Sequence, residues 1–180
     1  RTACSVAQGL AYGAQGLGRA GGLPVLPVDT LLALAEEARQ SRVDAGVPLP
    51  GVIVALLDAR MGEVYVAPYA CGAPGPAGLI PLAPPRLCTP TDLRAYLQDL
   101  APGERLLAGN VFELEALAAL EGQRHNALPT AAALLRLAPG LLNAGHAVAA
   151  QDALPLYVRD KVAQTTVERE SIRMAAEASP

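Results

Sequence analysis

Apolar and polar positions follow helical spacing in the first part of the chain and strand spacing in the middle. Residues 2–12 place small or apolar side chains three and four positions apart, which predicts a helix. Residues 23–28 are short and β-branched but contain two prolines, which predicts an edge strand, because proline cannot donate to a ladder. Asp29 and Thr30 precede a second amphipathic run, so we expect an N-capped helix there.

The strongest strand pattern covers residues 52–58, which are apolar at both alternating sets of positions. Such a strand belongs inside a sheet that is covered on both faces. A tight turn over residues 60–62 leads into residues 63–69, which alternate with period two. Gly62 suits the positive φ that such turns require. We therefore predict a central β-hairpin, with a short third strand over residues 79–82.

The remaining pattern alternates helix and strand. Thr89 and Asp92 begin a helix that runs to Leu100, and the pattern then predicts a strand over 106–110 and helices over 111–120 and 130–137. An extended piece is expected over 154–159. Three antiparallel strands followed by α/β units predict an α/β fold of the ribonuclease H-like type, with helices packed on a mixed sheet.

The chain of 180 residues has room for one domain or two small ones. We expect residues 1–45 to form a helix, a strand and a helix, which the family resemblance described below implies to be the remnant of a first lobe. Residues 41–50 are polar and rich in turn formers, which is typical of a linker. Residues 51–163 are expected to form a second lobe, and residues 164–180 a polar, mobile tail.

Composition excludes several classes of protein. With 52% hydrophobic and 17% charged residues the chain is not intrinsically disordered. The net charge is −3 and no segment is basic, so the chain alone is not expected to hold a phosphate backbone. The only lysine, Lys161, lies in no glycine-rich phosphate loop, which excludes Walker-type hydrolysis. The apolar runs fall short of the roughly 20 residues that span a bilayer.

The reactive side chains form no recognisable catalytic or metal motif. Cys4, Cys71 and Cys88 are far apart and make no CxxC pair, which is typical of a protein in the reducing cytoplasm. His125 and His146 have no second ligand at metal spacing. No serine lies in a nucleophile elbow, and there is no zinc-peptidase helix motif. We expect neither a cofactor nor enzyme activity.

Three stretches resemble one known family. They are VAQGLA at 6–11 followed by LPVLPVDTL at 23–31, then DARMGEVY at 58–65, then PLYVR at 155–159. In order and spacing they are similar to the TsaB family, also called YeaZ, of the sugar kinase–Hsp70–actin superfamily. The family's Asp-x-x-Thr strand and its Gly-Pro-Gly-Ser-Phe-Thr-Gly turn do not occur here. The resemblance therefore implies a chain that lacks most of the N-terminal lobe.

This resemblance implies a function. TsaB proteins are non-catalytic accessory subunits of the complex that makes N6-threonylcarbamoyladenosine in tRNA. The expected partners are a TsaD-like catalytic subunit and a TsaE-like ATPase, with tRNA reached only through the complex and no membrane contact. Two alternatives stay open. One is a glycoprotease-like peptidase or an ATP-binding enzyme of the actin-like superfamily, and the other is a self-associating homodimeric scaffold.

The hairpin turn is the first candidate site. Actin-like second lobes bind phosphate through glycines that let backbone amides approach the oxygens. Here the side chains of residues 59–61 would block that approach, and Gly62 comes too late. Asp58 is therefore predicted to cap the hairpin and pair with Arg60, the alternative being a remnant of a phosphate site. Glu63 and Tyr65 share one face of the return strand, where Tyr65 is expected to pack over the strand edge.

The first helix is the second candidate site. Small residues at 3, 7, 9, 11 and 13 would let another backbone approach closely, although this face could instead pack on the protein's own sheet. The residues expected to face the partner are Arg1, Ser5, Gln8 and Tyr12. Without a first lobe, six apolar side chains of residues 1–40 are expected to be exposed and to drive association. They are Val6, Leu10, Val25, Leu31, Leu32 and Leu34.

Overall fold

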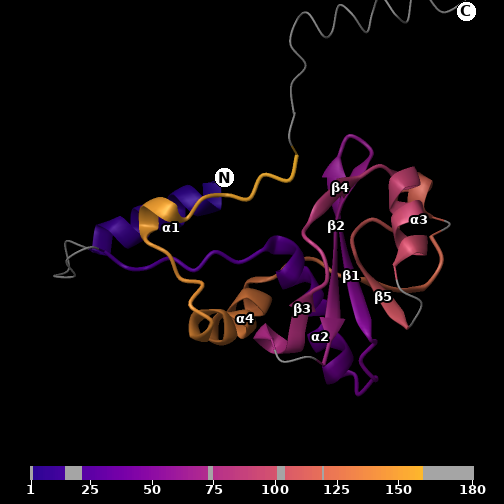
Figure 1. Cartoon of the computed structure of the whole chain (residues 1–180), viewed down its shortest axis with the longest axis horizontal. Coiled ribbons are helices and arrows are strands. Elements are labelled where there is room, and N and C mark those ends of the chain that lie inside the picture. Colours follow the sequence, from indigo (N-terminus) through magenta and orange to yellow (C-terminus); the bar gives the residue numbers. More distant parts are fainter. Residues whose placement is uncertain (1, 15–21, 73–74, 101–103, 119, 160–180) are drawn as a thin grey trace, which may run out of the picture.

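The centre of the molecule is a six-stranded mixed sheet with helices on both faces (Figure 1). The computed structural model describes residues 2–14, 22–72, 75–100, 104–118 and 120–159. The strand order is β3-β2-β1-β5-β6, and β4 also pairs with β2. This order, with an antiparallel half and a parallel half, is the predicted ribonuclease H-like fold.

The hairpin lies at the middle of the sheet, as predicted. Strands β1 (Val52–Arg60) and β2 (Glu63–Cys71) pair antiparallel, with Ile53 opposite Tyr69 and Leu57 opposite Tyr65. Ile53 and Ala55 enter the core on one face of the sheet, whereas Val54 and Leu56 enter the core on the other. The doubly apolar pattern of β1 thus reflects burial on both faces.

The third strand is broken into two pieces, which corrects the single strand predicted over 79–82. Strand β3 (Leu79–Pro81) pairs with residues 69–71, and β4 (Arg86–Cys88) pairs with residues 64–66. Between them lie residues 82–85, which end in two prolines. Because proline has no N–H to donate to a ladder, the chain leaves the sheet here and returns four residues later.

The parallel half contains β5 (Arg105–Gly109) beside β1 and β6 (Gln123–Asn126) beside β5. The prediction of a helix over 111–120 is wrong, because among the described residues of this range only Glu115–Leu117 are helical, and they form a 3-10 turn. Val111, Leu117 and Leu120 are buried, so their apolar character reflects core contacts and not a helical face. The carboxyl ends of β1, β5 and β6 meet at one edge of the sheet.

Helices α2 (Thr30–Asp44) and α4 (Ala131–Asn143) cover one face, and α3 (Pro90–Asp99) covers the other (Figure 1). Each begins with a side-chain cap. The Leu31 N–H donates to Asp29 Oδ1 at 2.7 Å, and Thr89 and Thr130 cap α3 and α4.

The apolar face of α2 packs on the sheet formed by residues 52–126. Leu31, Leu32 and Leu34 are buried in the same core as Ile53 and Leu106. The expectation that these three leucines would be exposed is therefore wrong. Of the other three side chains expected in water, Val6 and Leu10 are exposed and Val25 is half-buried.

Helix α1 (Thr2–Gly13) lies apart from the sheet, beside the segment that contains the 3-10 turn Ala150–Asp152 (Figure 1). The Tyr12 hydroxyl donates to Gln151 Oε1 at 3.2 Å, and the Leu23 N–H donates to the Ala11 carbonyl. The strand predicted over 23–28 is reduced to a single bridge between Val25 and Val148. Residues 154–159 form no strand.

A third 3-10 turn covers Pro76–Gly78. No helix in the described part of the chain is long and apolar enough to cross a lipid bilayer. Arg1, Lys161 and the predicted tail at 164–180 lie outside the described residues.

Candidate functional site

The turn between β1 and β2 carries three consecutive residues with positive φ. The angles are 67° at Arg60, 58° at Met61 and 74° at Gly62. The left-handed region is unfavourable for residues other than glycine, so the turn needs side-chain support. Asp58 supplies it: Oδ1 accepts from the Arg60 N–H at 2.8 Å, and Oδ2 lies 3.6 Å from Arg60 Nη1. Asp58 therefore caps the turn and pairs with Arg60, as the sequence predicts.

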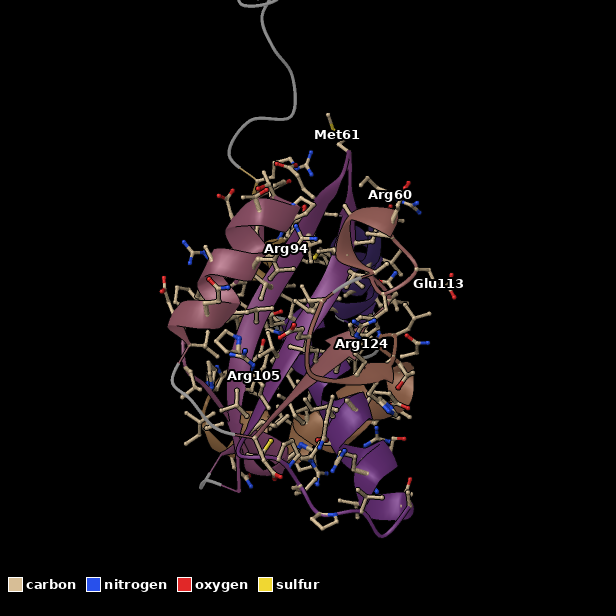
Figure 2. All side chains as sticks on the ribbon, turned by 90° about the vertical axis from the view of Figure 1, so that its right-hand side faces the viewer. Arg60, Met61, Arg94, Arg105, Glu113 and Arg124 are labelled. Atoms are coloured by element: carbon tan, nitrogen blue, oxygen red, sulfur yellow. The ribbon has the colours of Figure 1, made fainter. Side chains whose placement is uncertain are left out.

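This turn offers little to a phosphate group. The Asp58 N–H already donates to Asn110 Oδ1 at 2.9 Å, and the Arg60 N–H is taken by the Asp58 carboxylate. The side chains of Arg60 and Met61 project at the tip of the hairpin (Figure 2), where Met61 is 78% exposed. A phosphate cradle needs several free amides directed to one point, and two amides of this turn are already bonded within the protein.

Arg159 joins the C-terminal segment to this hairpin. Its Nη2 lies 2.7 Å from Glu63 Oε2 and donates to the Ala59 carbonyl at 3.1 Å, while Nη1 lies 3.1 Å from Met61 Sδ. The Arg159 side chain is only 12% exposed. Two of the stretches that carry the resemblance, 58–65 and 155–159, thus meet in space, although neither stretch alone predicts this contact.

Glu63 and Tyr65 have different roles on β2. Glu63 is held by Arg159, whereas Tyr65 is half-buried and packs against the core on the α2 face. Tyr65 lies opposite Leu57 on β1 and Leu87 on β4. Tyr65 is therefore a packing residue of the hairpin.

A hollow lies at the carboxyl ends of the parallel strands, a common position for ligands in α/β sheets. Asn110, Glu113 and Asn126 line it together with Gly109, Ala127 and Leu128, around a volume of about 350 Å³. Gly109 is required here because a Cβ would stand 1.7 Å from the Leu56 carbonyl oxygen. The sequence analysis missed these residues. The available signal was an asparagine at the end of two successive short strands.

The chemical groups near this edge are hydrogen-bonding amides and one exposed carboxylate. Among the described residues, no three His, Cys, Asp or Glu side chains lie close enough to hold a metal ion.

Burial raises the pKa of the Cys71 and Cys88 thiols, so both stay protonated at neutral pH and are poor nucleophiles.

Three arginines on the α3 side of the sheet stabilise the fold. Arg94, Arg105 and Arg124 lie on this side of the sheet (Figure 2). Arg94 donates to the Ala116 carbonyl, Arg105 to that of Leu97, and Arg124 to that of Leu120. Their guanidinium groups therefore bind backbone carbonyls of loops and of the end of α3.

Helix α1 exposes the surface that the sequence assigns to a partner. Ser5 and Tyr12 are exposed and Gln8 is half-buried, while the Tyr12 hydroxyl also contacts Gln151. Val6 is 56% and Leu10 is 73% exposed. A methyl group added at Gly9 or Gly13 would meet no atom within 4 Å, so these two glycines do not pack on the protein's own sheet.

The sheet order and the helices on both faces define the class: this is a ribonuclease H-like α/β lobe. Two solved structures from Pseudomonas aeruginosa are similar to it. One is an uncharacterized protein with similarity to peptidase YeaZ, with a TM-score of 0.65 and 26% identity over 87% of this chain. The other is YeaZ, with a TM-score of 0.63 and 26% identity over 86% of this chain.

The chain spans 66% and 64% of the lengths of these two proteins, slightly less than two thirds. No protein-family model matches the sequence, and no curated protein matches it. The likeness supports a YeaZ-like fold for this chain.

Proposed function

We propose that this protein is a non-catalytic accessory subunit of the machinery that makes N6-threonylcarbamoyladenosine in tRNA. In this role it binds and supports a TsaD-like catalytic subunit in the cytoplasm, together with a TsaE-like ATPase, and meets tRNA only within the complex. The observation that carries the proposal is the YeaZ-like fold, shared at 26% identity over 87% of the chain.

The geometry of the hairpin favours a supporting role over a catalytic one. The carboxylate of Asp58 is used by the Arg60 amide and guanidinium, and the Glu63 carboxylate is held by Arg159. A general base must have a lone pair within reach of its substrate, and these carboxylates instead hold the hairpin and the C-terminal segment together. The same contacts speak against the peptidase and ATP-binding alternatives.

Helix α1 is the surface we assign to the catalytic subunit. It carries exposed Val6 and Leu10 together with the polar side chains of Ser5 and Gln8, and its glycines leave room for a partner backbone. An apolar patch rimmed by polar groups is typical of a protein–protein interface. The same surface would also serve a homodimer, so self-association remains the second candidate for α1.

Deletion of the gene in a living cell, followed by complementation, tests the proposal. The gene for this protein is deleted, and the threonylcarbamoyladenosine content of digested tRNA is measured by mass spectrometry. We expect the modified nucleoside to fall strongly and to return when the gene is supplied on a plasmid. An unchanged content in the deletion strain would contradict the proposed function.

A further inference from the structure

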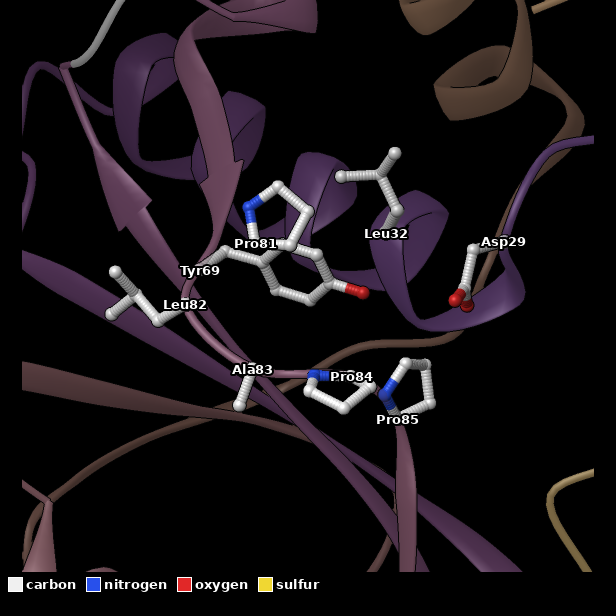
Figure 3. A pocket seen from close by; sticks show the side chains of 8 residues that line it. All are labelled: Asp29, Leu32, Tyr69, Pro81, Leu82, Ala83, Pro84 and Pro85. Carbon is white, nitrogen blue, oxygen red and sulfur yellow. The ribbon is translucent and has the colours of Figure 1, made fainter.

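An apolar cavity of about 350 Å³ opens between the start of α2 and the proline-rich segment that separates β3 from β4 (Figure 3). The apolar residues that line it are Leu32, Pro81, Leu82, Ala83, Pro84 and Pro85. Small-molecule sites have volumes of this order and are mostly apolar, with a few polar groups that orient the ligand. This cavity has two polar groups, on Tyr69 and Asp29.

Tyr69 is buried, with 2% of its surface exposed, yet its hydroxyl points into the cavity (Figure 3). No hydrogen bond joins this hydroxyl to another described residue, and its oxygen is open to the cavity. Burial raises the pKa of Tyr69 well above its ordinary value, so the group stays a neutral phenol. A phenol that faces a cavity without a protein partner can hydrogen-bond to water or to a ligand.

Among the described residues that line the cavity, Asp29 is the only charged one. Its Oδ1 accepts from the Leu31 N–H at 2.7 Å, which fixes the carboxylate at the start of α2. Figure 3 shows the Tyr69 hydroxyl directed toward this carboxylate across the open space, and no hydrogen bond joins the two. A group that donates to the carboxylate and contacts the phenol oxygen would fit between them.

We propose that this cavity binds a small cationic amine with a compact apolar body. The ammonium would donate to the Asp29 carboxylate and to the Tyr69 hydroxyl oxygen, while the apolar body would lie against Leu32, Pro84 and Pro85. The charge of the site selects a cation over an anion, because the described residues lining the cavity include one carboxylate and no basic side chain. This site is independent of the surface assigned to the catalytic subunit.

Benzylamine is a suitable probe, with benzyl alcohol and benzoate as neutral and anionic probes of matched shape. The full chain is labelled with ¹⁵N and titrated with each compound. We expect benzylamine to give saturable shifts of the Leu32 and Leu82 amides, benzyl alcohol to bind more weakly, and benzoate not to bind. Equal binding of benzoate and benzylamine, or no saturable binding of benzylamine, would overturn the proposal and leave a cavity that holds only water.

Two isosteric variants test the polar groups. Asp29→Asn retains a residue that caps helices well and removes the charge, and Tyr69→Phe removes only the hydroxyl. We expect the affinity for benzylamine to fall about tenfold and about fivefold, respectively. Asp92→Asn is the control, because it removes an acid from the start of α3, outside the cavity lining.

Either variant binding benzylamine as tightly as the parent would overturn the assignment. Thermal melts establish that each variant is folded, and if Asp29→Asn is not, then Tyr69→Phe alone decides the outcome.

Discussion

Glu36 is fully buried in α2, and its carboxylate joins two helices. Oε2 lies 2.6 Å from Arg39 Nε within α2, and Oε1 lies 2.9 Å from Arg136 Nε on α4. Arg136 also contacts Glu37 at 2.7 Å. A buried carboxylate is tolerated only when it is paired, so these contacts explain why a charged residue can occupy the apolar face of α2.

Removal of Glu36 should destabilise the protein strongly. Glu36→Ala would leave Arg39 and Arg136 without their buried partner, and we expect a loss of about 3–5 kcal/mol in the free energy of unfolding. Urea unfolding followed by circular dichroism measures this change. Glu113→Ala, at an exposed position, is the control. A loss of less than about 1 kcal/mol would contradict the role assigned to Glu36.

Glu37 should make stability depend on pH in the acidic range. The Thr130 hydroxyl, and then Arg136, lower the pKa of Glu37 below its ordinary value of 4.5. A carboxylate with a lowered pKa stabilises the folded state above its unfolded pKa, and this stabilisation is lost as the pH falls through the folded pKa. The melting temperature of Glu37→Gln should therefore be lower than that of the parent at neutral pH. The difference should vanish in strong acid, and a constant difference would contradict the linkage.

Among the elements, those with a strong local signal were predictable and those fixed by distant contacts were not. The hairpin follows from apolar residues on both faces of β1, and the caps of α2 and α3 follow from Asp29 and Thr89. Strand β6, with the sequence Gln-Arg-His-Asn, has no apolar alternation because it is an exposed edge strand. Contacts follow the same rule. Asp58 and Arg60 are close in sequence, and their contact was predictable. The contact of Arg159 with Glu63 joins distant segments and was not.

The central position of β1 is tested by truncation of one leucine. Leu56 is fully buried on the α3 face of the sheet, so Leu56→Ala should cost about 2–5 kcal/mol. Leu57 is half-buried, so Leu57→Ala should lower the free energy of unfolding by less. Leu135→Ala, at a position that is 74% exposed, is the control. If Leu56→Ala has the same melting temperature as the parent, β1 does not lie in the centre of the sheet.

The Arg159 contact should hold the C-terminal segment on the hairpin. Arg159→Ala removes the ion pair with Glu63 and the hydrogen bond to Ala59. We expect faster hydrogen exchange of the Ala59 and Met61 region, with a small loss of global stability of about 1 kcal/mol. Glu113→Ala again serves as the control. Unchanged exchange at the hairpin would show that Arg159 does not hold this segment.

At the scale of the whole molecule, the structure consists of a YeaZ-like lobe and a helix, α1, that lies beside it. The central hairpin of the lobe and the α/β units after it were predictable from local patterns, and the likeness to YeaZ was predictable from three short stretches. The close packing of α2 on this lobe was not, since its leucines predict burial but not the sheet that buries them. The exposed surface of α1 is the part of the molecule that we propose binds the partner.

The mass of the complex formed with the TsaD-like subunit of the same organism tests the central claim most directly. Light scattering coupled to size-exclusion chromatography should show this chain and the TsaD-like subunit eluting together. Leu10→Arg should abolish the complex, because a charge would enter the apolar surface of α1. Leu135→Arg should leave it intact, since Leu135 is equally exposed but lies on α4. Separate elution of the two parent proteins at micromolar concentration would contradict the account.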